Sequence, residues 1–386
     1  MCDIMYVINK HGEKQMKILH TGDIHLDSAF CAVSSTEANA LRQHQRDILK
    51  KIFKIANEEA CDMILISGDL FDTCYVTPET RELCLSLFSD FQKPIIISPG
   101  NHDPLVDGSF YKSSLLPENT FVFTSSELQY FDFPELKTTV AGYAFTSSVM
   151  TKSPLEGEVA QRENQPNLIL CAHADLDSVA TRYAPLLTSD ILRHGFIYTA
   201  LGHIHKVPET PEHIRYCGFP EGRGFDEQGD GGVLIVSIDD TGAVSAKRII
   251  TSDIRYLTEE LSVTGMSCWE IERAVASRIE DMSRDCRTAI RLELVGVLTE
   301  DTLPDITSIS KANNEQVISV EIINSTLCLP SSEGLEKDIT LRGELYRTLK
   351  GKLMSDDREE RRTALLALKI GLSAIDGKDF TDGGVL

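Results

Sequence analysis

The sequence predicts a layered α/β fold, followed by a smaller α/β segment and C-terminal helices. Through the first hundred residues, short apolar runs alternate with stretches of helical periodicity, as in βαβ units. Several of these apolar runs end abruptly in polar clusters that contain Asp, Asn or His. After residue 250 the pattern changes, and longer amphipathic stretches replace the short apolar runs.

Hydrophobic spacing predicts the first elements in order. Between residues 36 and 60, apolar residues recur three to seven positions apart, which favours a helix. The next helix is expected to begin at Thr77, an N-cap residue followed by Pro78 at the first helical position. The predicted order is strand 17–20, helix 36–60, strand 63–66, helix 77–91 and strand 95–97.

The strand pattern resumes further along the chain. The polar stretch 151–166 is expected to be a loop. Apolar or alternating runs predict strands at 120–123, 138–143, 168–171, 196–201 and 233–238.

The second half predicts a smaller α/β segment and two helices. A helix is expected over 269–282, with alternating strands at 289–294 and 317–322 and a linker at 326–334. In the two helices that follow, apolar residues recur every three or four positions. They form either a hairpin packed on its own domain or a docking surface for a coiled-coil partner, because both predict the same stripes.

Charge and composition limit the functions to consider. The chain has 386 residues, 42% of them hydrophobic, and a net charge of −21 with no strongly basic segment. A protein that binds DNA alone by neutralising phosphates normally has a basic face. The sequence therefore argues against DNA binding without a partner.

Cysteine usage and the N-terminus predict a reducing compartment. The ten cysteines include no Cys-x-x-Cys pair, and the first residues lack the layout of a secretory signal. No apolar run reaches the length of a membrane span. We therefore expect a cytoplasmic protein with reduced thiols and no membrane partner.

Five apolar runs end in the clusters GDIH, GDLFD, GNHD, CAHAD and LGHIH. Ligand sites in α/β sheets lie at the carboxyl ends of strands, so these clusters are expected to converge. Each cluster alone is weak evidence for a site, since an isolated Asp-x-His usually occurs in a loop by chance. The side chains brought together would be Asp23, His25, Asp69, Asn101, His102, His173, His203 and His205.

These side chains favour a two-metal site. Oxygen and imidazole ligands without a thiolate suit Mn²⁺, Fe or Zn, and they are too many for one tetrahedral ion. Two ions about 3.5–4 Å apart are the usual device for in-line displacement at phosphorus. The composition of the cluster therefore points to hydrolysis of a phosphate ester.

The ordered motifs resemble the calcineurin-like metallophosphoesterase superfamily over roughly residues 16–250. This resemblance implies a layered metallophosphoesterase fold, with two β-sheets flanked by helices. The segments KILHTGDIHLDS, GNHDP, YAPLLTSDILRHGFIYTALGHIH and YCGFPEGRGFDEQGDGGVLIV are similar to the SbcD-type nuclease branch. One departure is Asp27, where better-known nucleases of the branch carry Gly.

The resemblance also implies a domain organisation. An N-terminal extension (1–15) precedes the metallophosphoesterase domain (16–250). A small α/β capping domain (251–325) and a C-terminal helical segment (326–386) follow it.

Carried over position by position, the resemblance implies a role for each site residue. A first metal would be held by Asp23, His25 and His205, a second by Asn101, His173 and His203, and Asp69 would bridge both. His102 matches the non-ligand catalytic histidine of the family, which stabilises the transition state or protonates the leaving oxygen. Asp103 would orient His102.

Neighbouring polar residues have simpler interpretations. Asp72 is expected to cap a helix or join a loop ion pair, and His20 to be a hydrogen-bonded core histidine. Arg223 either contacts phosphate or makes a structural ion pair. Asp27, Asp175 and Asp177 either support metal ligands or are solvated.

The leading functional hypothesis is a phosphodiesterase that hydrolyses DNA with two divalent ions. Manganese is the first choice, with iron, zinc or magnesium as alternatives. The resemblance implies an SbcC-like ABC-type coiled-coil ATPase as partner, and a homodimer is left open. A small-molecule phosphodiesterase or phosphatase on the same site is the main alternative, and a scaffold without activity is the third.

Overall fold

The fold is described from a computed structural model, over residues 15–31, 34–113, 115–157, 167–178, 180–284, 287–299, 302, 304–313, 317–329 and 332–377. Most of the expected N-terminal extension, and residues 158–166 of the expected loop, lie outside this part. The chain divides into two compact units. The first comprises Met1–Arg223 and Asp230–Ser252, and the second Gly224–Gly229 and Asp253–Leu386.

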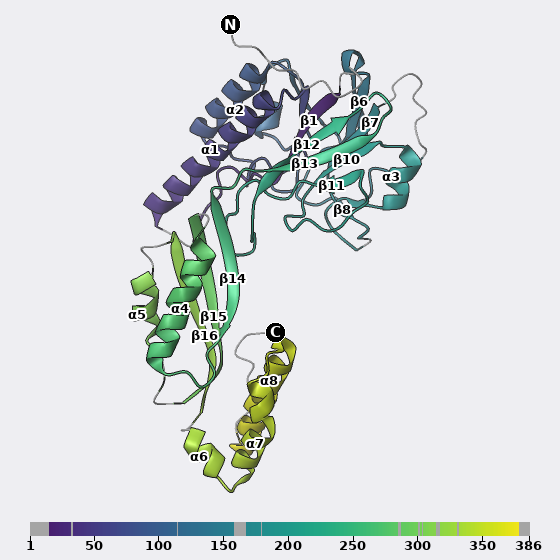
Figure 1. The fold of residues 1–386 in the computed structure, drawn as a ribbon. Coiled ribbons are helices and arrows are strands. Elements are labelled where there is room, and N and C mark those ends of the chain that lie inside the picture. Colours follow the sequence, from purple (N-terminus) through teal and green to yellow (C-terminus); the bar gives the residue numbers. More distant parts are fainter. Residues whose placement is uncertain are drawn as a thin grey trace. The chain divides into compact units, whose positions relative to one another are not determined.

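The first unit is built on a six-stranded sheet of order β13-β12-β1-β2-β3-β4 (Figure 1). Strands β1 to β4 are parallel, and β12 pairs antiparallel with β1. The strands are β1 (Met16–Thr21), β2 (Met63–Ile66), β3 (Ile95–Ile97), β4 (Thr120–Val122), β12 (Gly232–Ile238) and β13 (Val244–Ile250).

Two helices cover one face of this sheet, α1 (Ser35–Glu58) and α2 (Pro78–Phe91) (Figure 1). Ile48, Ile52 and Phe53 of α1 are buried in the same core as the strand residues. Thr77 caps α2 by accepting a hydrogen bond from the Thr80 amide, with Pro78 at the first helical position, as the sequence predicts.

A second sheet, of order β11-β10-β7-β6-β5, lies against the first. Its strands are β5 (Gln129–Phe133), β6 (Thr138–Gly142), β7 (Asn167–His173), β10 (Tyr198–Gly202) and β11 (Ile214–Tyr216). Side chains of β7 alternate between two cores: Ile169 and Cys171 face the first sheet, whereas Leu170 and Ala172 pack with Ile191.

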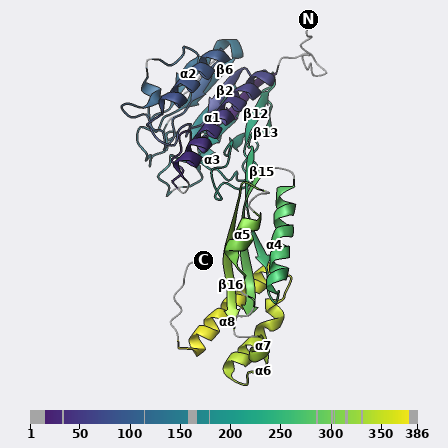
Figure 2. The same ribbon diagram turned by 90° about the vertical axis from the view of Figure 1, so that its left-hand side faces the viewer.

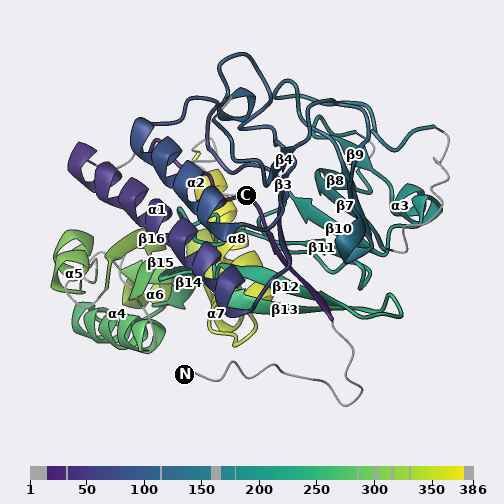
Figure 3. The same cartoon turned by 90° about the horizontal axis from the view of Figure 1, so that it is seen from above.

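Helix α3 (Thr188–His194) carries Ile191 and lies on the opposite side of the unit from α1 and α2 (Figures 1 and 3). The layers are therefore helix, sheet, sheet and helix, which confirms the predicted fold of two β-sheets flanked by helices. Smaller elements are β8 (Asp175–Leu176), β9 (Pro185–Leu186), η1 (Phe110–Lys112) and η2 (Pro134–Leu136).

The second unit contains a parallel three-stranded sheet of order β14-β15-β16 (Figures 1 and 2). Ile271, Val275 and Ile279, on one face of α4, are buried with Ile290 and Leu292 of β15. The elements are β14 (Ile254–Ser262), α4 (Cys268–Ser283), β15 (Arg287–Thr299), α5 (Ile306–Asn313) and β16 (Ser319–Leu329).

The predicted linker at 326–334 is wrong for most of its length. Strand β16 continues to Leu329, which pairs with Thr299, and helix α6 (Ser332–Lys337) follows. The extension occurs because β15 continues to Thr299 and offers backbone hydrogen bonds that the neighbouring strand can satisfy. The helical part thus begins at residue 332.

The C-terminal helices α7 (Leu341–Leu353) and α8 (Arg358–Ile375) form a hairpin. Leu353, Ala364, Leu368 and Leu372 are buried in its core, together with Val297 of β15. Leu366 and Ile370, on α8, are 46% and 43% exposed. One stripe therefore packs within the unit, and a second apolar stripe faces solvent.

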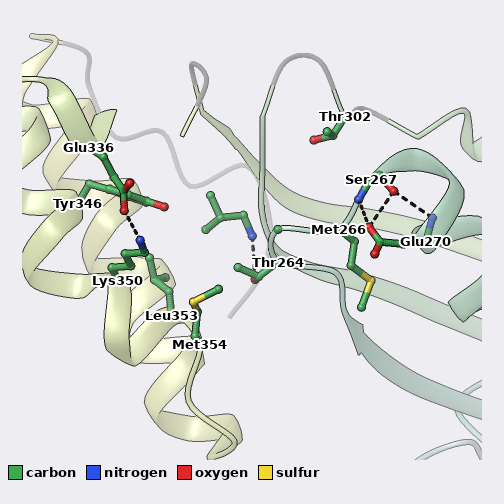
Figure 4. Close-up of a pocket in the computed structure, with 12 residues that line it drawn as sticks. Thr264, Met266, Ser267, Glu270, Thr302, Glu336, Tyr346, Lys350, Leu353 and Met354 are labelled. Atoms are coloured by element: carbon green, nitrogen blue, oxygen red, sulfur yellow. Dashed lines mark hydrogen bonds and ion pairs between the residues drawn. The ribbon is translucent and has the colours of Figure 1, made fainter. Parts of the chain in front are cut away.

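A pocket of about 410 Å³ lies between this hairpin and the turn before α4 (Figure 4). Ser267 and Glu270 on one side form the capping box of α4, and Lys350 on the other pairs with Glu336. The four charged or capping groups among its lining residues thus bond in two pairs. No helix among the described residues is long and apolar enough to cross a membrane.

We predict that Leu368→Ala destabilises the second unit by about 2–4 kcal/mol, because the fully buried side chain leaves a cavity in the hairpin core. The free energy of unfolding is measured by urea titration, with hydrogen exchange of α7 and α8 as the readout. The matched control, Leu366→Ala on the exposed face of α8, is expected to change stability by less than about 0.5 kcal/mol. Equal effects of both variants would contradict the packing.

Candidate metal centre

The polar clusters lie at the carboxyl ends of β1, β2, β3, β7 and β10 or in the loops that follow them. Four of their residues adopt left-handed backbone conformations: Asp23 (φ 49°), His25 (φ 50°), Asp69 (φ 48°) and His203 (φ 100°). This conformation is strained for residues other than Gly, and the strain persists where the surrounding structure enforces it, as is common at functional sites. The backbone is thus bent to bring these side chains to one place.

Glycines stand directly before two of the ligand candidates, Asp69 and Asn101, because no larger residue fits there. Gly68 has φ +97°, and a Cβ there would overlap the His173 ring. A Cβ on Gly100 would overlap the Asp69 carboxylate. Because the β2 and β3 loops approach their neighbours so closely, the Gly-Asp and Gly-Asn pairs are required by packing as well as by chemistry.

A first group of potential ligands consists of Asp23, His25 and His205, whose donor atoms lie within 4.8 Å of one another. His205 Nε2 is 3.8 Å from Asp23 Oδ1, and it is 3.3 Å from His25 Nε2. Two imidazole nitrogens and a carboxylate oxygen facing one point are the donors of a divalent-ion site.

A second group consists of Asp23, Asp69 and His173. His173 Nε2 is 3.2 Å from Asp69 Oδ2 and 2.9 Å from Asn101 Oδ1. Asp69 Oδ2 also lies 3.8 Å from His25 Nε2, so this carboxylate stands between the two groups. That is the position of a bridging ligand.

His203 belongs to neither of these three-residue groups. Its ring centre is 5.0 Å from that of His173, and its Nε2 is 3.5 Å from Asp175 Oδ1. The backbone amide of His203 donates to both carboxylate oxygens of Asp23, each at 3.0 Å. Asp175 thus occupies Nε2 of His203, which leaves Nδ1 as its nitrogen for an ion.

Two further histidines have one ring nitrogen fixed by an oxygen. His25 Nδ1–H donates to Asp72 Oδ1 at 3.0 Å, and His173 Nδ1–H donates to the Ser67 carbonyl at 2.9 Å. A second partner of this kind sets the tautomer of a metal-binding histidine and makes the remaining nitrogen more basic. The Nε2 atoms of His25 and His173 are thereby left for the centre.

Burial makes a positive charge necessary at this site. Asp23 and Asp69 are 1% and 2% exposed. Burial raises the pKa of Asp23. Burial acts in the same direction on Asp69, but the facing imidazoles, His173 first, hold its pKa well below the usual range. Buried carboxylates are stable only when paired or bound to a cation.

The charge of Asp69 controls the protonation of His173. Burial lowers its pKa, but the charge of Asp69 outweighs burial and raises the pKa to about 9. The proton on Nε2 then lies where the donor atoms converge, so a cation and this proton compete for the same place.

The donor set fits two divalent ions with oxygen and nitrogen ligands. The thiol of Cys217 lies 3.9 Å from Asp23 Oδ2, and burial raises its pKa well above the usual value. It therefore stays protonated and offers no thiolate. The fit holds for Mn²⁺, Fe or Zn, as the residue types predict.

His102 lies at the rim of the centre, with its side chain 45% exposed. Its amide donates to Asp69 Oδ1 at 3.0 Å, while its Nδ1 is 3.3 Å from the Asp72 carbonyl and 3.5 Å from Asp72 Oδ1. The hydrogen bond to Asp72 raises the pKa of His102. The ring is thus available to substrate and is held by Asp72.

Asp103 does not have the contact expected of it. Its buried carboxylate accepts hydrogen bonds from the Gly100 amide (2.8 Å), the Phe71 amide (3.1 Å) and the Tyr111 hydroxyl. Among the described residues, none of its hydrogen bonds reaches the His102 ring. Asp103 instead ties together the loops after β2 and β3, because its side chain points into the core rather than toward the rim.

Asp72 is the functional contact that sequence reasoning underestimated. It forms the expected loop ion pair, with Arg223 Nη1 3.1 Å from its Oδ1. The same oxygen also holds His25 and approaches His102. Its place three residues after Asp69 in GDLFD was the available signal.

The remaining neighbours are structural or supporting. Asp27 accepts hydrogen bonds from Thr77 and Thr80 at the start of α2, and Asp177 accepts two from Thr188 at the start of α3. His20 is fully buried and bonds to Tyr198 and Ser67, as a core histidine should.

Fold and donor set together suit a phosphoesterase that depends on metal ions. Residues 16–207 match the calcineurin-like phosphoesterase family, so this part of the chain belongs to that family.

The chain is also similar to several curated proteins. It is 24% identical over 263 residues to the uncharacterized metallophosphoesterase YhaO of Bacillus subtilis, covering 64% of each chain. It is 25% identical over 256 residues to the SbcD component of the SbcCD nuclease of Escherichia coli K12, covering 55% of this chain and 62% of the relative. It is 26% identical over 263 residues to the DNA double-strand break repair protein Mre11 of Saccharolobus solfataricus, covering 63% and 66%. These matches span less than two thirds of each relative.

We predict that the chelator-stripped protein binds two Mn²⁺ per chain, and that Asp69→Asn weakens both sites at least about 10-fold, because Asp69 faces both groups. Isothermal titration calorimetry measures both affinities. Asp177→Asn is the control, since within the described part of the chain this carboxylate bonds to Thr188 only. Two sites of unchanged affinity in Asp69→Asn would contradict the bridging position.

We also predict different effects for Asp72→Ala and Asp103→Ala. Asp72→Ala lowers activity or metal affinity about 10–100-fold with little change in Tm, because it releases the rings of His25 and His102. Asp103→Ala leaves buried amides without acceptors and lowers stability by about 1–3 kcal/mol. Thermal unfolding and steady-state kinetics on the same preparations separate these effects. A reversed pattern would return the orienting role to Asp103.

Proposed function

We propose that the protein is a two-metal phosphodiesterase that hydrolyses phosphodiester bonds of DNA. The observation that carries the proposal is the position of Asp69 between two donor groups, with the exposed ring of His102 beside them. Two donor groups sharing a carboxylate suit in-line displacement at phosphorus, since charge develops on both the attacking and leaving oxygens.

The proposed ligand sets use every residue that was predicted to bind a metal. Asp23, His25 and His205 hold one ion, Asn101, His173 and His203 hold the other, and Asp69 bridges them. When bound, the ions supply charge for the phosphoryl oxygens and lower the pKa of a water molecule. We propose Mn²⁺ as the native ion, with iron, zinc and magnesium as alternatives.

The chain's own residues position and protonate the reacting groups. His102 is exposed at the rim, and its contact with Asp72 favours the protonated ring by raising the pKa of His102. It can therefore stabilise the transition state or give a proton to the leaving oxygen. Asp72 contacts the rings of His25 and His102 through one oxygen, so it fixes the position of a proposed ligand relative to the proposed acid.

DNA is supported as the substrate by two relatives, one named as a nuclease component and the other as a double-strand break repair protein. The charge of −21 makes DNA binding without help unfavourable. We therefore propose an SbcC-like ABC-type coiled-coil ATPase as partner, which would supply the grip on DNA. The exposed stripe with Leu366 and Ile370 on α8 is the surface offered to it.

A small-molecule phosphodiesterase is the second candidate. The acidic character of the chain favours it, because a small anion needs only the local field of the ions. A scaffold without activity is the third candidate, but the chain keeps every predicted ligand. A cytoplasmic location and a homodimer stay predictions.

The test is hydrolysis of linear double-stranded DNA, single-stranded DNA and bis-p-nitrophenyl phosphate with Mn²⁺, with Mg²⁺ or with a chelator. We expect Mn²⁺-dependent cleavage of DNA, and a loss of about 10²–10⁴ in kcat for His102→Ala at unchanged metal content. His194→Ala is the matched control, since its ring stacks on Phe196 on α3's side of the unit.

Each other outcome selects another function. Cleavage of the small diester alone, even with a partner ATPase present, would favour the small-molecule phosphodiesterase. No activity together with no bound metal would favour the scaffold.

A further inference from the structure

The loop after β2 carries a strongly exposed aromatic residue. Tyr75 is 84% exposed, and it follows Asp72 by three residues. A singly exposed aromatic residue is ordinary on a protein surface. Tyr75 is of interest because it lies three residues from Asp72, which contacts both His25 and His102.

This loop is braced at both ends. The Thr73 hydroxyl accepts a hydrogen bond from the Tyr75 amide (3.2 Å) and lies 3.1 Å from the Tyr75 carbonyl, to which it can donate. At the far end, the Thr77 amide donates to Asp27 Oδ2 at 2.8 Å. The backbone of Tyr75 is therefore held in a turn, so that little backbone entropy is lost when the ring contacts a ligand.

A guanidinium contacts the same aspartate. Arg223 Nη1 is 3.1 Å from Asp72 Oδ1, and the Arg223 side chain is 22% exposed. Arginine matches the geometry of phosphate oxygens and always carries its charge. Around a centre rich in carboxylates, this charge favours an anionic substrate.

We infer that Tyr75 and Arg223 form a nucleotide subsite next to the metal centre. Arg223 binds the phosphate of a nucleotide next to the bond that is cleaved, and the Tyr75 ring stacks on its base. Together they select a nucleotide over a simple phosphate ester, since a base offers a π-face and a phosphate offers paired oxygens. The inference rests on the proposed phosphodiesterase function and adds that the substrate is a strand with unpaired bases.

The experiment compares two chains of equal length, single-stranded DNA and a chain of abasic tetrahydrofuran nucleotides. The full-length protein is loaded with Mn²⁺, and kcat/KM is measured on both chains and on bis-p-nitrophenyl phosphate. We expect the wild-type protein to favour the chain with bases about 10-fold. In Tyr75→Ala this ratio falls toward one, whereas Tyr75→Phe keeps it.

Arginine variants test the other half of the subsite. Arg223→Gln is expected to raise KM about 10-fold on both chains while the ratio between them is kept, and Arg223→Lys to restore part of the loss. An ion pair with a structural role only would change Tm and metal content instead. Leu192→Ala, an exposed apolar residue on α3, is the control for surface truncation.

The results separate the subsite from the function on which it rests. Equal rates of the wild-type protein on both chains, or an unchanged ratio in Tyr75→Ala, would overturn the subsite and leave the nuclease intact. Cleavage of bis-p-nitrophenyl phosphate with no cleavage of either chain would overturn the proposed nuclease and the subsite with it.

Discussion

Two buried carboxylates govern this structure. Asp23 and Asp69 are almost fully enclosed, and a charge in that position is stable only if cations or protonated imidazoles surround it. The strained backbone at Asp23, His25, Asp69 and His203 brings carboxylates and imidazoles together. The tight approach at Gly68 and Gly100 serves the same end. The local geometry follows from how these two charges are compensated.

The same requirement links the two sheets. Asp23, His25, Asp69 and Asn101 follow strands of the first sheet, whereas His173, His203 and His205 follow strands of the second. Each of the two donor groups takes residues from both sheets. A cation bound at the centre would therefore also hold the sheets together, alongside the buried contact of His20 with Tyr198. Metal binding would for this reason be coupled to the stability of the first unit.

Sequence reasoning predicted the parts of the fold that depend on hydrophobic pattern. The central strands are buried on both faces and leave unbroken apolar runs, and the capped helix after Thr77 has its own local signal. Strands β5, β11, β13 and β14 were missed, because their exposed or short stretches are set by pairing with neighbours. The end of β16 depends in the same way on the length of β15.

In the site, residue types gave the donor set but not the contacts. Chain order suggested that Asp103 holds the adjacent His102. The turn sends Asp103 inward to Gly100, Phe71 and Tyr111, and Asp72 reaches the ring from thirty residues earlier. Which carboxylate faces which ring depends on backbone angles that spacing does not encode.

The net charge of the chain and the local charge at the centre act on a nucleic acid in opposite directions. At long range a charge of −21 repels a nucleic acid, whereas two bound divalent ions and Arg223 would offset Asp23, Asp69 and Asp72 close by. The repulsion is screened within about 8–10 Å at physiological salt, but the enclosed centre is screened much less. A strand delivered to the rim would therefore meet attraction, and one diffusing freely would meet repulsion. Such a field favours substrates that a partner brings in.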